Sequence, residues 1–307
     1  MSNYKTVFFT LGILQIILGI SMIFPIIIQI IFGELNSSFI SASLITIIFG
    51  TLFLLSNLDQ DKKLNLQHAF LLTALSWISV AIFGSLPFIF SDLNLSITDS
   101  FFESMSGITT TGSTIITDLN STPKAILLWR AILQWLGGIG IIVMAITLMP
   151  LMNVGGMQLL KVSSTDGSEK ILPKTKEISI RLIIIYMTLT FLCALFYKIF
   201  GMKFFDSLTH SMTTIATGGF SNYNDSIGHF NNFKIEMTSM VFIILGSIPF
   251  IAYIKYLSGT KNIFITDTQI KSFIKIIFFS ILILFLYLVI FNKSFSEISL
   301  RSISFRS

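Results

Sequence analysis

The chain has 307 residues, of which 53% are hydrophobic and only 11% are charged, and its mean hydropathy is +0.84. This composition lies far outside that of soluble domains and is typical of a protein that crosses a membrane several times. The net charge of +5 is spread over loops between apolar segments, so a nucleic-acid-binding function is not expected. The single cysteine, Cys193, excludes an intramolecular disulfide and a cysteine-type metal site.

Seven apolar segments are long enough to cross about 30 Å of hydrocarbon as helices. They lie at Val7–Phe32, Phe39–Leu55, His68–Phe90, Ala125–Met149, Leu182–Phe200, Met237–Leu257 and Phe273–Phe291. The first segment is too long for a signal-peptide core and no A-x-A-like cleavage site follows it, so we expect it to stay in the mature protein. Most basic residues fall on one side of the membrane if the N-terminus is cytoplasmic, and that is the orientation we predict.

A shorter apolar segment, Ile97–Ile108, lies between the third and fourth spans and cannot cross the bilayer. Asp99 near its start suits the positive end of a helix dipole, and a Thr/Gly run follows its end. Bare backbone is tolerated at membrane depth only where protein or a water-filled cavity surrounds it. We therefore predict a re-entrant pore helix followed by a filter strand, whose carbonyl oxygens replace the water around a dehydrated cation. The predicted filter residues are Thr109, Thr110, Thr111 and Gly112.

The same order recurs between the fifth and sixth spans. Phe204–Thr213 is the predicted second short helix, with Asp206 near its start, and a second Thr/Gly run follows. Aligning Gly112 with Gly218 gives an internal repeat with a period of 106 residues. The second predicted set of filter residues, again acting through the backbone, is Ile215, Ala216, Thr217 and Gly218.

The repeat divides the chain into four parts of an all-α polytopic membrane protein. Residues 1–63 hold two leading transmembrane helices, and residues 64–162 and 163–262 each hold one helix–pore-loop–helix unit. Residues 263–307 hold the outer helix and the start of the pore helix of a third unit. One period beyond Gly218 would place a third glycine near position 324, past Ser307, so we expect the third unit to be incomplete.

Six strings of residues together resemble the Trk/Ktr family of potassium-uptake proteins, and within it the TrkH type. They are Phe101–Gly112, Pro123–Arg130, Gln134–Gly140, Val154–Leu159, Ala216–Ser221 and Ser226–Gly228. The resemblance implies four helix–pore-loop–helix units around one pore, two extra helices in front of them, and potassium as the substrate of channel-like permeation without a cofactor. It also implies a bacterial inner membrane, a homodimer, and a cytoplasmic nucleotide-binding regulatory subunit as partner.

Against that pattern the chain supplies only two of the four filter strands. Three expectations follow: a nonfunctional truncated remnant, half of a split transporter complemented by a second chain with units three and four, or a pore built from two copies. The outer helix of the third unit has no place in such a two-copy pore and argues against it. A membrane-embedded enzyme would need acid–base or nucleophilic groups within the spans, and no such constellation is present.

Several single features leave alternatives open. The glycines at 137, 138 and 140 serve either helix packing or a hinge. Arg130 is expected either to snorkel toward the outer surface or to pair with Glu103 behind the filter. Glu103 has a second interpretation, in which it faces the outer vestibule together with Asp118 and Asp225. The polar segment Ser163–Lys176 either docks a regulatory ring or only marks the cytoplasmic side.

Overall fold

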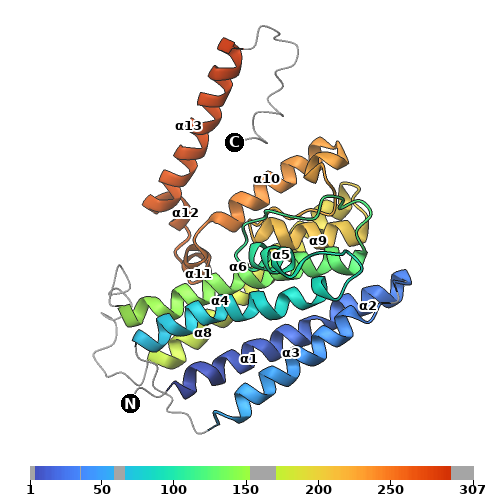
Figure 1. Ribbon diagram of the computed structural model, residues 1–307. Coiled ribbons are helices and arrows are strands. Elements are labelled where there is room, and N and C mark those ends of the chain that lie inside the picture. Colours follow the sequence, from blue (N-terminus) through green and yellow to red (C-terminus); the bar gives the residue numbers. More distant parts are fainter. Residues whose placement is uncertain (1–3, 35, 59–65, 153–170, 292–307) are drawn as a thin grey trace.

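The computed structural model describes residues 4–34, 36–58, 66–152 and 171–291; within them, the side chains of 66, 141–152, 171–176 and 288–291 are not described. All regular elements in these ranges are helices, which confirms the predicted all-α class (Figure 1). The motif Val154–Leu159, residues 163–170 of the polar inner segment and the predicted start of a third pore helix lie outside the described residues.

The leading part of the chain forms one pair of long helices. α1 (Lys5–Ser21) and α2 (Ile23–Phe32) together make one apolar stretch of 28 residues, and α3 (Ser38–Leu55) returns beside α1 (Figure 1). A Cβ added to Gly12 would lie 2.7 Å from the carbonyl oxygen of Gly50. The two helices therefore meet backbone to backbone at small residues, as helices commonly do in membranes.

The next elements follow the predicted order of long helix, short helix, loop and long helix. α4 (Leu66–Ile89) precedes the short helix α5 (Ile97–Ile108), and α6 (Lys124–Met152) follows the first Thr/Gly loop. The Ser96 side chain accepts the Asp99 N–H at the start of α5, which is an ordinary N-cap. The core around these helices is apolar and includes Phe39, Phe88 and Trp129.

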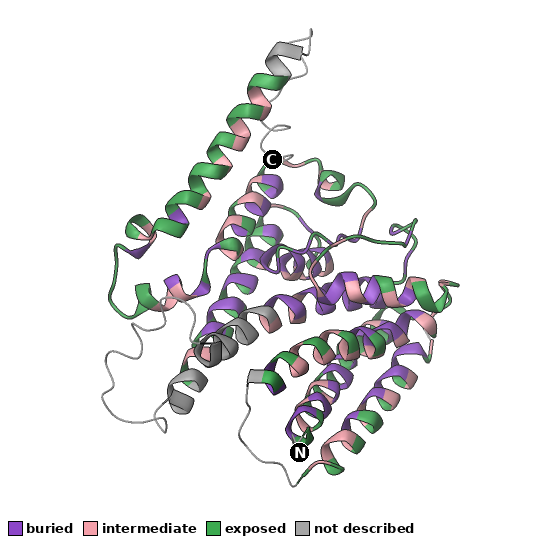
Figure 2. Cartoon of the chain, turned by 60° about the vertical axis from the view of Figure 1, so that its left-hand side comes forward, coloured by how far each residue is buried: buried purple, intermediate pink, exposed green. Residues whose placement is uncertain are grey.

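The same order returns in α8 (Ile171–Ile199), the short helix α9 (Phe204–Ile215) and α10 (Phe233–Ser247), with a 3-10 turn, η2 (Ser226–Phe230), before α10. α11 (Phe250–Leu257) and α12 (Ile263–Thr266) lead to α13 (Thr268–Phe291). α13 stands away from the bundle and is largely exposed (Figures 1 and 2).

The predicted sixth span, Met237–Leu257, is a pair of helices with a sharp bend between them. α10 and α11 meet at an angle of 82° across Ile248 and Pro249. Proline has no N–H to donate to the preceding turn, and it drives the residue before it into extended backbone. Ile248 has that conformation, with φ −68° and ψ 135°. The apolar run continues through the bend, so hydropathy alone could not show it.

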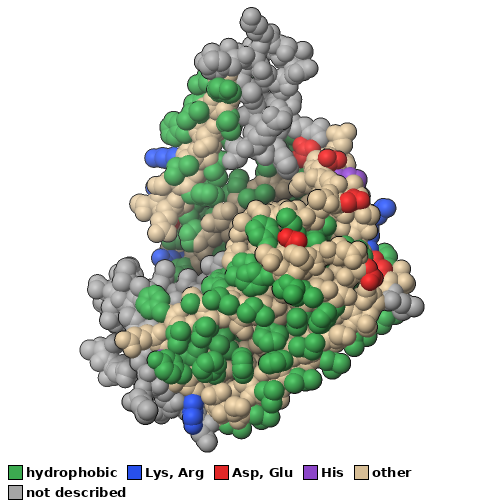
Figure 3. Space-filling view, viewed as in Figure 1, with side chains coloured by type: hydrophobic (Ala, Val, Ile, Leu, Met, Phe, Trp, Pro, Cys, Tyr) green, Lys and Arg blue, Asp and Glu red, His purple; other side chains and the backbone are tan. Residues whose placement is uncertain are grey.

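Among the residues with described side chains, five helices are long and apolar enough to cross a membrane, or six if the bent pair is one span. α6, with 29 residues, is not in that count because its second half has no described side chains. Hydrophobic side chains cover much of the broad face in Figure 3, where charged ones are few. The chain is therefore a membrane protein with several apolar helices, as predicted.

A polar contact links the end of α2 to the start of α6. The Glu34 carboxylate, just after α2, accepts the backbone N–H of Lys124 at 2.7 Å and of Ala125 at 3.1 Å. These N–H groups open α6 and have no partner within the helix, and a negative charge there also complements the helix dipole. Glu34 thus caps a helix that begins 90 residues later, a role that was not predicted from the sequence.

Replacing Glu34 with alanine should therefore destabilise the protein by about 1 kcal/mol, the usual effect of losing an N-terminal cap. Thermal unfolding in detergent micelles measures the change. Asp92→Ala is the matched control, because that carboxylate accepts a hydrogen bond from Asn36 at an exposed position. Equal shifts for the two variants would show that the contact with α6 contributes nothing of its own.

Candidate functional site

The two short helices and the loops after them repeat with a period of 107 residues. α5 runs from 97 to 108 and α9 from 204 to 215, so both ends are offset by the same number. Thr110 and Thr217 both have a positive φ, +56° and +51°, and Gly112 and Gly219 follow with +80° and +82°. The predicted period of 106 is therefore wrong by one residue, and the counterpart of Gly112 is Gly219.

The error has a simple cause, because the second loop has two adjacent glycines and the sequence does not say which one matches Gly112. Gly218 corresponds instead to Thr111: the N–H groups of both donate back to the short helix, to Ser106 O and Thr213 O, each at 2.9 Å. Ile215 is the last residue of α9 rather than part of the loop. The first loop is accordingly Thr109–Ser113, and the second loop is Ala216–Phe220.

The two loops touch through their backbones. A Cβ added to Gly112 would lie 2.0 Å from the carbonyl oxygen of Gly218, far inside van der Waals contact. Gly112 also has a positive φ, a region that side-chain-bearing residues rarely adopt. The structure thus brings together predicted residues of both sets, which are separated by about a hundred positions in the sequence.

Each short helix ends at its loop, so its C-terminal end faces the loop backbone. That end of a helix carries roughly half a negative charge, which favours a nearby cation. The following long helix packs close to it: a Cβ on Gly137 of α6 would lie 1.9 Å from Ile108 O, and a Cβ on Gly246 of α10 would lie 2.7 Å from Ile215 O. α6 runs unbroken through Gly137, so close packing explains this glycine.

A buried ion pair lies behind the first loop. Arg130 Nε donates to Glu103 Oε1 at 2.7 Å, and the two side chains are 1% and 0% exposed. The same carboxylate accepts from the Thr114 hydroxyl and the Ile115 N–H. The predicted pairing is confirmed; snorkelling by Arg130 and a vestibule position for Glu103 are wrong, because neither side chain reaches solvent.

Arg130 also joins the first unit to the second loop. Its Nη1 donates to the carbonyl oxygen of Ser221 at 2.8 Å, and its guanidinium lies 4.1 Å from the centre of the Phe220 ring. A guanidinium suits this position because it offers several donors in one plane and stacks on aromatic faces. One side chain therefore connects Glu103, and through it the segment just after the first loop, to the end of the second loop.

Behind the second loop, His210 occupies the position that Glu103 has behind the first, 107 residues earlier. It is buried; Nδ1 donates to the Asp206 carbonyl at 2.9 Å and Nε2 lies 3.0 Å from the Ser221 hydroxyl. The Asp206 carboxylate accepts from Asn222 and from the Tyr223 hydroxyl. Burial and that carboxylate raise the pKa of Tyr223 to about 12.

The segments that follow the two loops carry exposed acids. Asp118 and Asp225 are both exposed, and a hydrogen bond from the Ser121 hydroxyl lowers the pKa of Asp118. The Asn224 side chain accepts the N–H of Leu119, so the segments after the two loops are also in contact. Their exposure fits both plain solvation and the predicted position in a vestibule.

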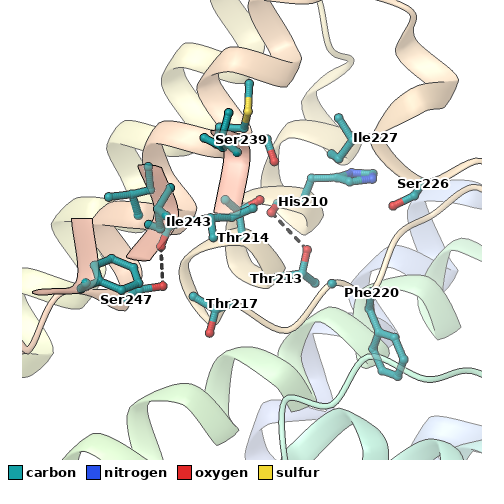
Figure 4. Close-up of a pocket in the computed structure, with 16 residues that line it drawn as sticks. His210, Thr213, Thr214, Thr217, Phe220, Ser226, Ile227, Ser239, Ile243 and Ser247 are labelled. Carbon is teal, nitrogen blue, oxygen red and sulfur yellow. Dashed lines mark hydrogen bonds between the residues drawn. The ribbon is translucent and has the colours of Figure 1, made fainter. Parts of the chain in front are cut away.

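A cavity of about 480 Å³ opens on the far side of the second loop from the first (Figure 4). It lies between this loop, α10 and α13, and its wall mixes the hydroxyls of Thr213, Thr217 and Ser239 with the apolar Phe220 and Ile243. The loop that Gly112 touches on one side thus faces open space on the other.

One residue of the site was missed by sequence reasoning. Gln134 is fully buried on α6 and binds the backbone of the second loop at two points. Its position four residues after Arg130, which places both on one helix face, was the available signal.

The model of the TrkH family, described as cation transport protein, matches residues 35–299. The chain belongs to this family. The family is one of transporters rather than enzymes, and the predicted Trk/Ktr resemblance is confirmed. A solved structure, the potassium transporter TrkH from Vibrio parahaemolyticus, superposes with a TM-score of 0.89 at 30% sequence identity, covering 99% of this chain and 63% of that one.

Curated relatives agree with this assignment. The Trk system potassium uptake protein TrkI of Halomonas elongata is 36% identical over 281 residues, or 91% of this chain and 57% of the relative. TrkH of Escherichia coli K12 is 35% identical over 295 residues, or 94% of this chain and 61% of the relative. The chain thus spans somewhat more than half the length of these relatives.

Proposed function

We propose that this TrkH-family chain takes part in potassium uptake, and that its two Thr/Gly loops are strands of the selectivity filter. The observation that carries the proposal is the repeated, positive-φ backbone of the two loops, which touch at Gly112 and Gly218. Glycine-rich backbone in a membrane protein is a means to turn carbonyl oxygens toward a dehydrated cation. The proposed filter residues are Thr109, Thr110, Thr111 and Gly112 in the first loop, and Ala216, Thr217 and Gly218 in the second, joined by Gly219 as the counterpart of Gly112. Ile215 stays in the proposal as the last residue of α9, directly before the second loop.

Potassium is the substrate, and no cofactor enters this scheme. A potassium ion is weakly hydrated compared with smaller cations, so neutral carbonyl and hydroxyl oxygens can replace its water. The helix ends at both loops add a favourable potential without a fixed negative charge beside the ion. The negative charge of Glu103 is instead neutralised by Arg130 behind the first loop.

The remaining parts of the proposal rest on the family. They are a bacterial inner membrane, a cytoplasmic N-terminus, a homodimer, and a cytoplasmic nucleotide-binding regulatory subunit. The names of the relatives, Trk system potassium uptake proteins, support a multi-component system. The division into leading helices and helix–pore-loop–helix units belongs to the same proposal.

Four strands surround the ion in the proposed filter, and the described part of this chain holds two. Gly219 has the backbone conformation of Gly112, yet nothing among the described residues lies within 4 Å of a Cβ built on it. By the repeat, this is where a third loop would touch the second. We therefore propose that the loops act together with further strands on the cavity side.

Growth at limiting potassium, in bacteria without potassium uptake of their own, tests the proposal. The chain is expressed alone and together with the part of Vibrio parahaemolyticus TrkH that the match leaves uncovered. We expect rescue in the combination and little rescue by either part alone. Rescue by this chain alone would favour a pore of two copies, and no rescue at normal membrane levels would identify a nonfunctional remnant.

A further inference from the structure

The side chain of Gln134 spans two backbone groups of the second loop. Its Nε2 donates to the carbonyl oxygen of Gly218 at 2.8 Å, and its Oε1 accepts the N–H of Phe220 at 3.1 Å. The residue is fully buried on α6, in the first unit. The two ends of one amide thus bind Gly218 and Phe220, on either side of Gly219 in the second loop.

This contact explains why the two loops differ in sequence. A Cβ on Gly218 would lie 2.4 Å from Cδ of Gln134, so only glycine fits where the first loop has Thr111. On its other side, the Gly218 carbonyl oxygen touches Gly112. The Gly218 carbonyl therefore lies between Gln134 and Gly112. We expect its position to be determined by Gln134.

Among the described residues, the pair of hydrogen bonds made by Gln134 has no counterpart on α10. The two long helices can be aligned by the glycine that packs against the end of the preceding short helix. This glycine is Gly137 in α6, against α5, and Gly246 in α10, against α9, so the offset is 109 residues. The counterpart of Gln134 is then Ile243, an apolar residue that lines the cavity beyond the second loop. No equivalent amide is therefore available on α10 at this level.

We infer that Gln134 is a positioning residue that fixes the spacing of the two loops and thereby makes the filter discriminate potassium from sodium. This inference rests on the proposed function. Sodium is the smaller ion, and to coordinate it the loop carbonyls would have to move inward. A loop held by Gln134 on one side and by Gly112 on the other resists that movement.

The test compares three variants of the full chain. Gln134→Leu removes both hydrogen bonds at similar size, and Gln134→Glu keeps the acceptor for Phe220 but loses the amide donor to Gly218. Gln15→Leu is the matched control, since Gln15 is also fully buried and donates to Ser79 at 2.6 Å, away from the loops. Uptake of rubidium as a potassium substitute, and of sodium, is measured under the condition in which wild type rescues growth.

We expect Gln134→Glu to lower the rubidium-to-sodium uptake ratio about tenfold, the effect of losing roughly one hydrogen bond, and Gln134→Leu to lower it by at least as much, because it loses both. A folding defect alone lowers both uptakes together and leaves the ratio unchanged, as expected for Gln15→Leu. On purified protein, amide exchange at Phe220 should also be about tenfold faster in Gln134→Leu.

Three results would count against the inference: an unchanged ratio in Gln134→Leu, unchanged exchange at Phe220, or the same loss of ratio in Gln15→Leu. If the wild-type chain takes up neither ion even in combination with the uncovered part of Vibrio parahaemolyticus TrkH, the proposed function fails. Exchange at Phe220 still decides in that case whether Gln134 positions the loop, so the two failures are distinguishable.

Discussion

Gly112→Ala is expected to abolish growth rescue at limiting potassium. The added Cβ would lie 2.0 Å from the Gly218 carbonyl oxygen, so the loops must separate. The positive φ of +80° adds a strain of about 1–2 kcal/mol for a residue with a side chain. Both effects act on the backbone that we propose contacts the ion. Rubidium uptake in the rescuing combination measures the loss, with membrane levels checked by immunoblot.

Gly228→Ala is the control for this experiment. Gly228 lies in η2, close to the second loop in sequence, but a Cβ there meets nothing within 4 Å and its φ is not positive. Uptake should stay near the wild-type value. Equal uptake by the Gly112 and Gly228 variants would sink the filter hypothesis for the first loop.

Arg130→Leu is expected to destabilise the protein by about 3–5 kcal/mol, because it leaves the Glu103 carboxylate buried without its cation. The hydrogen bonds from Thr114 and Ile115 remain but do not neutralise the charge. The change also removes the donor to Ser221 and the contact with Phe220. Chemical unfolding in detergent micelles measures the loss.

An exposed ion pair on α8 serves as the comparison for the buried Glu103–Arg130 pair. Arg181 and Glu177 are 2.8 Å apart with side chains 49% and 62% exposed, so Arg181→Leu should cost less than about 1 kcal/mol. The double variant Glu103→Leu/Arg130→Leu should recover part of the stability lost in Arg130→Leu, since no lone charge remains. Strictly additive losses in the double variant would show that the two groups do not depend on each other.

The helices were predicted well where neighbouring residues in the sequence determine them. The bounds of α5 agree with the predicted Ile97–Ile108, and α9 extends only two residues beyond the predicted end at Thr213. Apolar length and a polar residue at the helix start determine such segments. The bend at Pro249 was missed because hydropathy is unchanged across it, although the Ile248–Pro249 step was a usable warning.

The site was predicted less completely, because its supports come from distant positions. The loops themselves stand out as Thr/Gly runs, but their register depends on which amides return to the short helices, and two adjacent glycines conceal this. Gln134 and Glu34 act on backbone groups 84 and 90 residues away, respectively. When a side chain binds a backbone group, any residue can be its partner, so the sequence gives no sign of which residue it is. The Glu103–Arg130 pair was foreseen because its members carry opposite charges.

The unequal residues behind the two loops limit how far the units can be exchanged. The backbone of one short helix and loop repeats the other, yet Glu103 is matched by His210, and the offset of the long helices places Ser239 where the first unit has Arg130. A chain with two copies of the first short helix would bury a carboxylate at position 210 with no cation on α10 facing it. Such a charge costs several kcal/mol. The two repeated parts have thus become complementary, each suited to its own place in the fold.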